Sequence, residues 1–114
     1  MAQTGIYEQV SRKDTPREAI DNFIDSNGVI EYPIYVSAKG VEKVQTPVIK
    51  LKRSNRVVII GYDGKVSKGK YELEAGVVTF SGESITGERQ YRLVVYKSGT
   101  YLESMDGRRH FKKR

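Results

Sequence analysis

The chain has 114 residues, with 20 Lys and Arg, 14 Asp and Glu, one His and no Cys, and a formal net charge of +6. This length fits one domain that can bury a core without disulfides or a metal, and the lack of cysteine excludes disulfide frameworks, cysteine-based zinc sites and thiol nucleophiles. No apolar run approaches the roughly 18 residues of a membrane span, and no apolar signal-peptide core follows the first Met. We therefore expect a soluble, cytoplasmic protein with no membrane contact.

A helix is predicted over residues 15–26, in the stretch "TPREAIDNFIDSNG". Thr15 can cap its start with Glu18 completing a capping box, and Gly28 follows its end. The apolar positions share one face, so the helix should pack on a sheet; they are Ala19, Ile20, Phe23 and Ile24.

Strands and tight turns are predicted over residues 29–106. The first, "VIEYPIYV", contains Pro33 and so indicates an edge strand or a bulge. A turn at Ser54-Asn55 would then pair Leu51 with Val58 and Ile49 with Ile60. Asp63-Gly64 is a strong hairpin signal, although "KVSKGK" after it is too polar to indicate a strand.

Two further hairpins are expected towards the end of the chain. A turn at Ala75-Gly76 predicts inward pairs of Leu73 with Val78 and of Tyr71 with Phe80, while Glu72 and Glu74 face water. A turn at Ser98-Gly99 predicts pairing of Val95 with Leu102 and of Tyr96 with Tyr101.

Short strands joined by tight turns predict a mainly β (α+β) fold, an antiparallel meander. We expect a curved sheet or small barrel with the N-terminal helix packed on it. The predicted domain covers residues 1–106, and residues 107–114 form a basic C-terminal tail.

The positive charge is concentrated in two blocks. Residues 107–114 carry five cations and no acid, so the other 106 residues hold 15 basic and 14 acidic side chains. Within that remainder, residues 47–70 carry seven cations against Asp63 alone. Such asymmetry is typical of a polyanion-binding surface, and it is also a common means of staying soluble.

The first block predicts phosphate contacts. If Ile49 and Leu51 point inward, the alternation of a strand turns the intervening and following lysines outward. Four residues would then follow a nucleic-acid backbone: Lys50, Lys52, Arg53 and Arg56. The alternative is that lysines on an edge strand only prevent aggregation.

The second block predicts an anchor for nucleic acid. Its cations surround an aromatic ring that could stack on bases; these residues are Arg108, Arg109, Phe111, Lys112 and Lys113. Arg92, Tyr96 and Tyr101 are expected to form a stacking face beside it. The alternatives are a solvated, frayed end and ordinary sheet tyrosines.

A metal-free ribonuclease is a further hypothesis. The lone His110 could act as acid, Glu88 or Glu103 as base, and three arginines could stabilise phosphorane charge: Arg89, Arg92 and Arg109. The segment "YRLVVYKSGTYLESMDGRRHFKKR" resembles the closing hairpin and basic end of RelE-type toxin ribonucleases. The helical hairpin that opens the toxin fold has no counterpart here, because residues 29–88 indicate strands.

The sequence favours a non-enzymatic protein that binds DNA or RNA in a regulatory or accessory role. We expect no cofactor and no metal, since a single histidine excludes multi-histidine sites and no phosphate-binding glycine loop is present. The main alternative is a module of the phage or plasmid accessory type that docks on a protein partner through an edge strand. A barrel that binds a small molecule is also open, although the short chain leaves little room.

Overall fold

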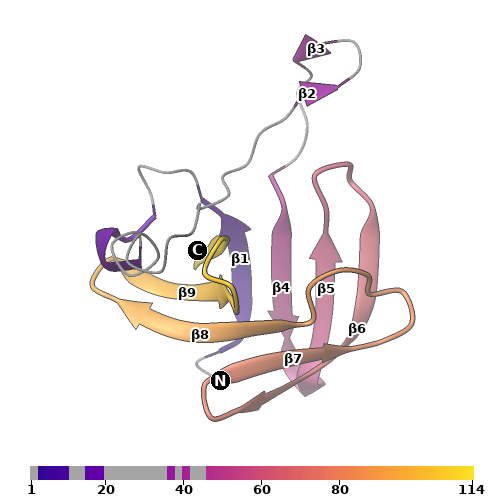
Figure 1. The fold of residues 1–114 in the computed structure, drawn as a ribbon. Coiled ribbons are helices and arrows are strands. Elements are labelled where there is room, and N and C mark those ends of the chain that lie inside the picture. Colours follow the sequence, from indigo (N-terminus) through magenta and orange to yellow (C-terminus); the bar gives the residue numbers. More distant parts are fainter. Residues whose placement is uncertain (1–2, 11–14, 20–35, 38–39, 42–45) are drawn as a thin grey trace.

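The computed structural model describes residues 3–10, 15–19, 36–37, 40–41 and 46–114 (Figure 1). Eight strands form a closed antiparallel barrel in the order β1-β10-β9-β8-β7-β6-β5-β4, and two short strands, β2 and β3, form a separate two-stranded sheet. The predicted antiparallel β fold is therefore confirmed, in its barrel form. The strands are β1 (Gly5–Gln9), β2 (Val36–Ser37), β3 (Gly40–Val41), β4 (Val48–Lys52), β5 (Arg56–Ile60), β6 (Val66–Glu74), β7 (Val77–Ser81), β8 (Gln90–Tyr96), β9 (Gly99–Ser104) and β10 (His110–Lys113), with a 3-10 turn, η2 (Arg53–Asn55).

The barrel is a meander closed by its first strand. From β4 to β10, each strand pairs with the next one in the sequence. Strand β1 lies between the two ends of this meander, where Tyr7 pairs with Lys113 of β10 on one side and with Ile49 of β4 on the other. Each barrel strand therefore has a hydrogen-bonded neighbour on both sides, which removes the free edges of an open sheet.

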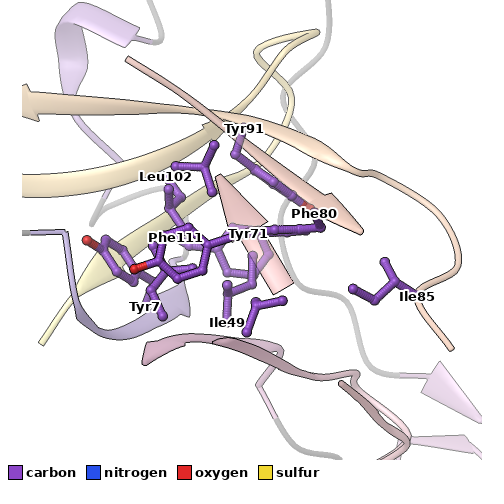
Figure 2. Packing of buried hydrophobic residues seen from close by; sticks show 11 residues of the cluster. Tyr7, Ile49, Tyr71, Phe80, Ile85, Tyr91, Leu102 and Phe111 are labelled. Atoms are coloured by element: carbon purple, nitrogen blue, oxygen red, sulfur yellow. The ribbon is translucent and has the colours of Figure 1, made fainter. Parts of the chain in front are cut away.

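The barrel interior is filled by side chains (Figure 2). Tyr91 contacts two other aromatic rings of the core. Its ring centroid lies 5.6 Å from that of Phe80, in a tilted arrangement, and 5.7 Å from that of Phe111, in an edge-on arrangement. Such tilted and edge-on pairs are the favoured geometries for aromatic rings. Eleven buried hydrophobic residues form this core: Tyr7, Ile49, Leu51, Val57, Tyr71, Val78, Phe80, Ile85, Tyr91, Leu102 and Phe111.

The β6–β7 hairpin has the predicted register. Tyr71 pairs with Phe80, and Leu73 pairs with Val78. The turn residues Ala75 and Gly76 have φ values of 50° and 77°, the left-handed conformation of a two-residue hairpin turn. Glu72 and Glu74 are exposed, as expected.

The predicted register of the β4–β5 hairpin was wrong by one residue. Leu51 pairs with Val57, and Ile49 pairs with Ile59, because the loop contains three residues, 53–55. Residues 57–60 are all apolar, so either alternation buries two of them and the pattern does not select a register. The observed register turns Arg56 outward, whereas the predicted one would direct it to the core face.

The predicted β8–β9 register was wrong by two residues. The turn consists of Lys97 and Ser98, so Tyr96 pairs with Gly99, and Val95 pairs with Thr100. Gly99, with a φ of 144°, begins β9 instead of lying in the turn. A shift of two residues preserves the faces of a strand. Tyr96 and Tyr101 therefore still share a face, with ring centroids 5.6 Å apart.

The expected basic tail is part of the barrel. Residues 110–113 form β10, which pairs with β9 and β1, so the domain does not end at residue 106. Phe111 is 4% exposed and points into the core, while its strand neighbours His110 and Lys112 lie on the outer face. Because Phe111 is a single apolar residue among cations, the sequence did not indicate the alternation of inward and outward side chains in this strand.

The predicted N-terminal helix lies mostly outside the described residues. Its start is visible as a helical turn at residues 17–19, in which the amide of Ala19 donates to the carbonyl of Pro16. This turn lies beside the end of the β8–β9 hairpin (Figure 1), and Thr15 and Ala19 are buried. The predicted strand at residues 29–36, including Pro33, also lies outside the described residues apart from its last residue, Val36.

All but the first residue of the polar segment "KVSKGK" lie in the first half of β6. Residues 66–70 pair with β5, and residues 70–74 pair with β7, so the strand changes partners near Gly69. A Cβ on Gly69 would lie 2.2 Å from the carbonyl oxygen of Ser81 and 2.6 Å from Cδ1 of Ile85. Only glycine permits this close approach, which allows Ile85 to insert into the core.

We expect Gly69→Ala to lower the free energy of unfolding by roughly 1–3 kcal/mol, because the added methyl group must displace a backbone carbonyl and a core side chain. Gly61→Ala is the matched control, since its Cβ would lie 3.1 Å from the flexible carboxylate of Asp63 and 3.9 Å, an ordinary contact distance, from the carbonyl oxygen of Lys65. Denaturant unfolding of both variants measures the difference. Equal stability of the two variants would contradict this description of the contact.

Candidate nucleic-acid interface

Cations gather on the outer face of β4, β5 and β6, which stand side by side (Figure 1). Lys52 pairs directly with Arg56, and Arg56 pairs directly with Lys70, so three cations form one row across three strands. One step further along the strands, Lys50 and Lys68 flank Val58. We call the whole group the cationic patch: Lys50, Lys52, Arg53, Arg56, Lys68 and Lys70.

Strand alternation and the η2 turn produce this patch. Because Ile49, Leu51 and Val57 point into the core, their neighbours along the strands, Lys50, Lys52 and Arg56, face outward. Ser54 and Asn55 adopt left-handed φ values of 60° and 56° in the turn, next to the exposed Arg53. Neighbouring strands lie about 4.8 Å apart, so the row of three cations spans about 10 Å. Lys50 is half-buried and the other five members are exposed.

The electrostatics of the patch are unfavourable for folding. Like charges directly opposite one another on adjacent strands destabilise a sheet. Within the described parts of the chain, none of the six patch residues forms an ion pair. By contrast, three arginines elsewhere each have a carboxylate partner: Arg92 with Glu103, Arg109 with Glu88, and Arg114 with Glu8. The patch therefore concentrates positive charge that the described fold leaves uncompensated.

The cations of residues 107–114 lie at different places on the barrel. Arg108 is exposed in the turn before β10, and the Arg109 guanidinium lies 3.2 Å from the Glu88 carboxylate. Lys112 lies on the outer face, where its strand neighbour is Glu8. Lys113 lies against Gly5, at the end of the barrel. These residues do not form a single anchor, and Phe111 is buried in the core.

The expected stacking face is a closed polar cluster on β8, β9 and β10. Tyr101 is fully buried, so its ring is not available to a base. The Tyr96 hydroxyl donates to Oε1 of Glu103 at 2.7 Å, and Arg92 donates to the carbonyl of Met105 at 2.8 Å. Arg92, Tyr96 and Tyr101 do share one face, as predicted, but their polar atoms are directed at protein groups.

His110 belongs to the same cluster. Its Nε2 lies 2.9 Å from Oε1 of Glu103, and its side chain is only 1% exposed. Because a carboxylate only accepts hydrogen bonds, the shared proton lies on Nε2. The other ring nitrogen, Nδ1, is buried without a hydrogen-bond partner among the described residues. A phosphodiester on the surface cannot reach this imidazole.

The remaining ribonuclease candidates have structural contacts. Arg89 donates to the carbonyl oxygens of Gly82 and Ile85 and so holds the loop that places Ile85 in the core. Glu88 accepts from Arg109 at 3.2 Å. Neither Glu88 nor Arg89 contacts His110 in the described structure. The structure does bring together His110, Glu103 and Arg92, but the imidazole of this group is buried.

Three exposed residues on or near the cationic patch were not among the site residues predicted from the sequence. Lys68 and Lys70 belong to the basic block, but the polar segment around them did not indicate a strand. Tyr62 is 62% exposed in the turn between β5 and β6. The signal available for the two lysines was their period-two spacing with Val66, which continues the outer face of a strand.

The pKa of Glu103 reflects its hydrogen bonds. Burial alone would raise it, but hydrogen bonds from His110 and Tyr96, with the charges of His110 and Arg92, outweigh burial and lower the pKa. The same arrangement raises the pKa of Tyr96, first through burial and then through its bond to Glu103. At neutral pH the cluster is a carboxylate surrounded by donors.

Three searches gave no match. In the ranges that the structure describes, no three His, Asp or Glu side chains form a group that could hold a metal ion. The same ranges contain no helix with the length and apolar character needed to cross a bilayer. No protein family, curated protein or solved structure matches this chain.

We expect Glu103→Gln to destabilise the fold at pH 7 by roughly 1–3 kcal/mol, because it weakens charge-assisted hydrogen bonds in a mostly buried site. A carboxyl with a lowered folded-state pKa stabilises the fold above its unfolded pKa, and this contribution is lost as the pH falls through the folded pKa. The difference between wild type and variant should therefore shrink below pH about 4.

Urea unfolding at pH 7 and at pH 3 tests this expectation, with Glu74→Gln as the exposed control carrying the same charge change. An equal destabilisation by Glu103→Gln at both pH values would show that the carboxylate charge has no part in it.

Proposed function

We propose that this chain is a non-enzymatic protein that binds DNA or RNA through the cationic patch, in a regulatory or accessory role. The observation that carries the proposal is the row of Lys52, Arg56 and Lys70. These three cations are directly opposed on adjacent strands, with no described ion-pair partner. Such a row costs stability, and a bound polyanion would relieve the repulsion.

Phosphate is the chemical group that best fits the patch. Lysine and arginine neutralise phosphates, and each neutralised phosphate releases condensed counterions into solution. Six cations, five on three adjacent strands and one in the η2 turn, can meet successive phosphates of one backbone. Arg53 and Arg56 add planar guanidinium groups that can bind phosphate oxygens in pairs. DNA and RNA present the same phosphodiester, so the patch fits either.

Two of the three other functions that the sequence left open find less support in the described barrel. Docking of a protein on an edge strand requires unpaired backbone groups. Each of the eight barrel strands has a hydrogen-bonded neighbour on both sides, so among the described strands only the two-residue β2 and β3 have an edge without a neighbour. General-acid catalysis by His110 requires access to substrate, and its side chain is 1% exposed. The solvated-lysine explanation also weakens, because β4 is not an edge strand.

We expect the double variant Arg56→Ala with Lys70→Ala to weaken nucleic-acid binding and to flatten its dependence on salt. If each side chain neutralises one phosphate, the slope of log K against log salt should become less steep by about 1.4 for a single strand and about 1.8 for a duplex. The loss should be similar for different base sequences, since phosphate contacts carry no sequence information.

Fluorescence anisotropy with labelled oligonucleotides, repeated at several salt concentrations, measures this change. The control is Lys97→Ala with Arg108→Ala, which removes the same two residue types from exposed turns outside the patch. If both double variants reduce affinity equally, the binding depends on net charge and the patch has no special role.

A further inference from the structure

An apolar row lies directly beside the cationic patch. Val48 pairs with Ile60, and Ile60 pairs with Val66, so these three side chains continue the outer face of the same three strands. Val66 is 49% exposed, while Val48 and Ile60 are half-buried. The outer face therefore changes from cationic at the η2 end to apolar at the other end. We call Val48, Ile60 and Val66 the apolar row.

An exposed aromatic ring lies at the apolar end. Tyr62 follows β5 in the turn to β6 and is 62% exposed. Three hydrogen bonds order this turn: the amide of Gly61 donates to the carbonyl of Lys65, Gly64 donates to Gly61, and Lys65 donates to the Asp63 carboxylate. Tyr62 is thus presented by a defined turn, which lowers the entropy lost on binding.

The two halves of this face match the two parts of a nucleotide strand. Successive rows are separated by two residues along each strand, or about 7 Å. A backbone bound over Lys50 and Lys68, the cations nearest to the apolar row, can therefore place its bases over that row and towards Tyr62. Base stacking on aromatic rings tolerates any sequence, because every base has a π face.

Duplex nucleic acid would use only half of this face. Its bases are stacked and paired inside the helix, so it presents phosphates to a convex barrel wall and leaves the apolar row and Tyr62 unused. We propose that the site prefers single-stranded nucleic acid, with phosphates on the cationic patch and a base stacked on Tyr62; this inference rests on the function proposed above.

The test is a comparison of a labelled 20-nucleotide oligothymidylate with a 20-base-pair duplex, by anisotropy across a range of salt concentrations. Wild type should bind the single strand at least tenfold more tightly than the duplex. Tyr62→Ala should weaken single-strand binding by roughly 5- to 100-fold, the range for loss of one stacked base, and leave duplex binding and the salt slope unchanged.

Tyr62→Phe is the matched control, because it keeps the ring and should retain single-strand affinity. Since Tyr62 is exposed, both variants should unfold at the wild-type denaturant concentration, which circular dichroism verifies. Equal affinity for the two oligonucleotides, or no effect of Tyr62→Ala, would overturn the single-strand inference while leaving phosphate binding by the patch intact.

Failure of the underlying function has a different signature. In that case neither oligonucleotide binds in a manner that Arg56→Ala with Lys70→Ala weakens. Vesicles containing phosphatidylserine provide a second probe. Vesicle binding that Tyr62→Ala abolishes, without any preference between the oligonucleotides, would assign the face to an anionic lipid surface and overturn the inference.

Discussion

Strand β1 hydrogen-bonds to β10 on one side and to β4 on the other, and these two pairings join the ends of the meander into a closed barrel. Closure fixes the alternation of every strand, because one face must fill the interior while the other meets solvent or the N-terminal segment. Closure also leaves β4 without a free edge. Its lysines are therefore not explained as edge-strand charges that prevent aggregation. In the closed barrel, the charged side chains of the strands lie on the outer wall.

Two parts of that wall handle charge in opposite ways. On β8 to β10, Arg92 and His110 surround the carboxylate of Glu103, and the cluster is mostly buried. On β4 to β6, cations oppose cations in the open. The first arrangement stabilises the barrel around neutral pH, whereas the second costs stability. A single acidic residue in place of Arg56 would convert the repulsion of Lys52 and Lys70 into attraction, and the proposed binding of a polyanion would offset the same repulsion.

Much of the fold could be predicted from the sequence where turn chemistry and alternation agree. The β6–β7 register was predictable because Ala75-Gly76 suits a left-handed turn and glutamates alternate with apolar residues. The β4–β5 register was not, because residues 57–60 are all apolar and either alternation buries them. Phe111 was misassigned because one apolar residue among cations gives no periodic signal, and only pairing with β1 and β9 reveals it as core.

In the candidate site too, the residues of one hairpin could be predicted and those brought together by longer-range pairing could not. Residues Lys50, Lys52, Arg53 and Arg56 could be placed together because they follow one hairpin. Lys70 could not be added, because its alignment with Arg56 depends on the register between β5 and β6. The buried state of Tyr101 and His110 depends on contacts far apart in the sequence, and local patterns carry no information about those contacts.

The proposal that nucleic acid binds to the cationic patch is tested most directly by mapping backbone amide chemical shifts during titration with oligothymidylate at physiological salt. We expect the largest changes on residues 48–70, in β4, β5, the β5–β6 turn and the first half of β6. The amides of β8, β9 and β10 should remain at their positions. Changes concentrated in β8 to β10, or a shift pattern without any focus on residues 48–70, would contradict the assignment of binding to the cationic patch.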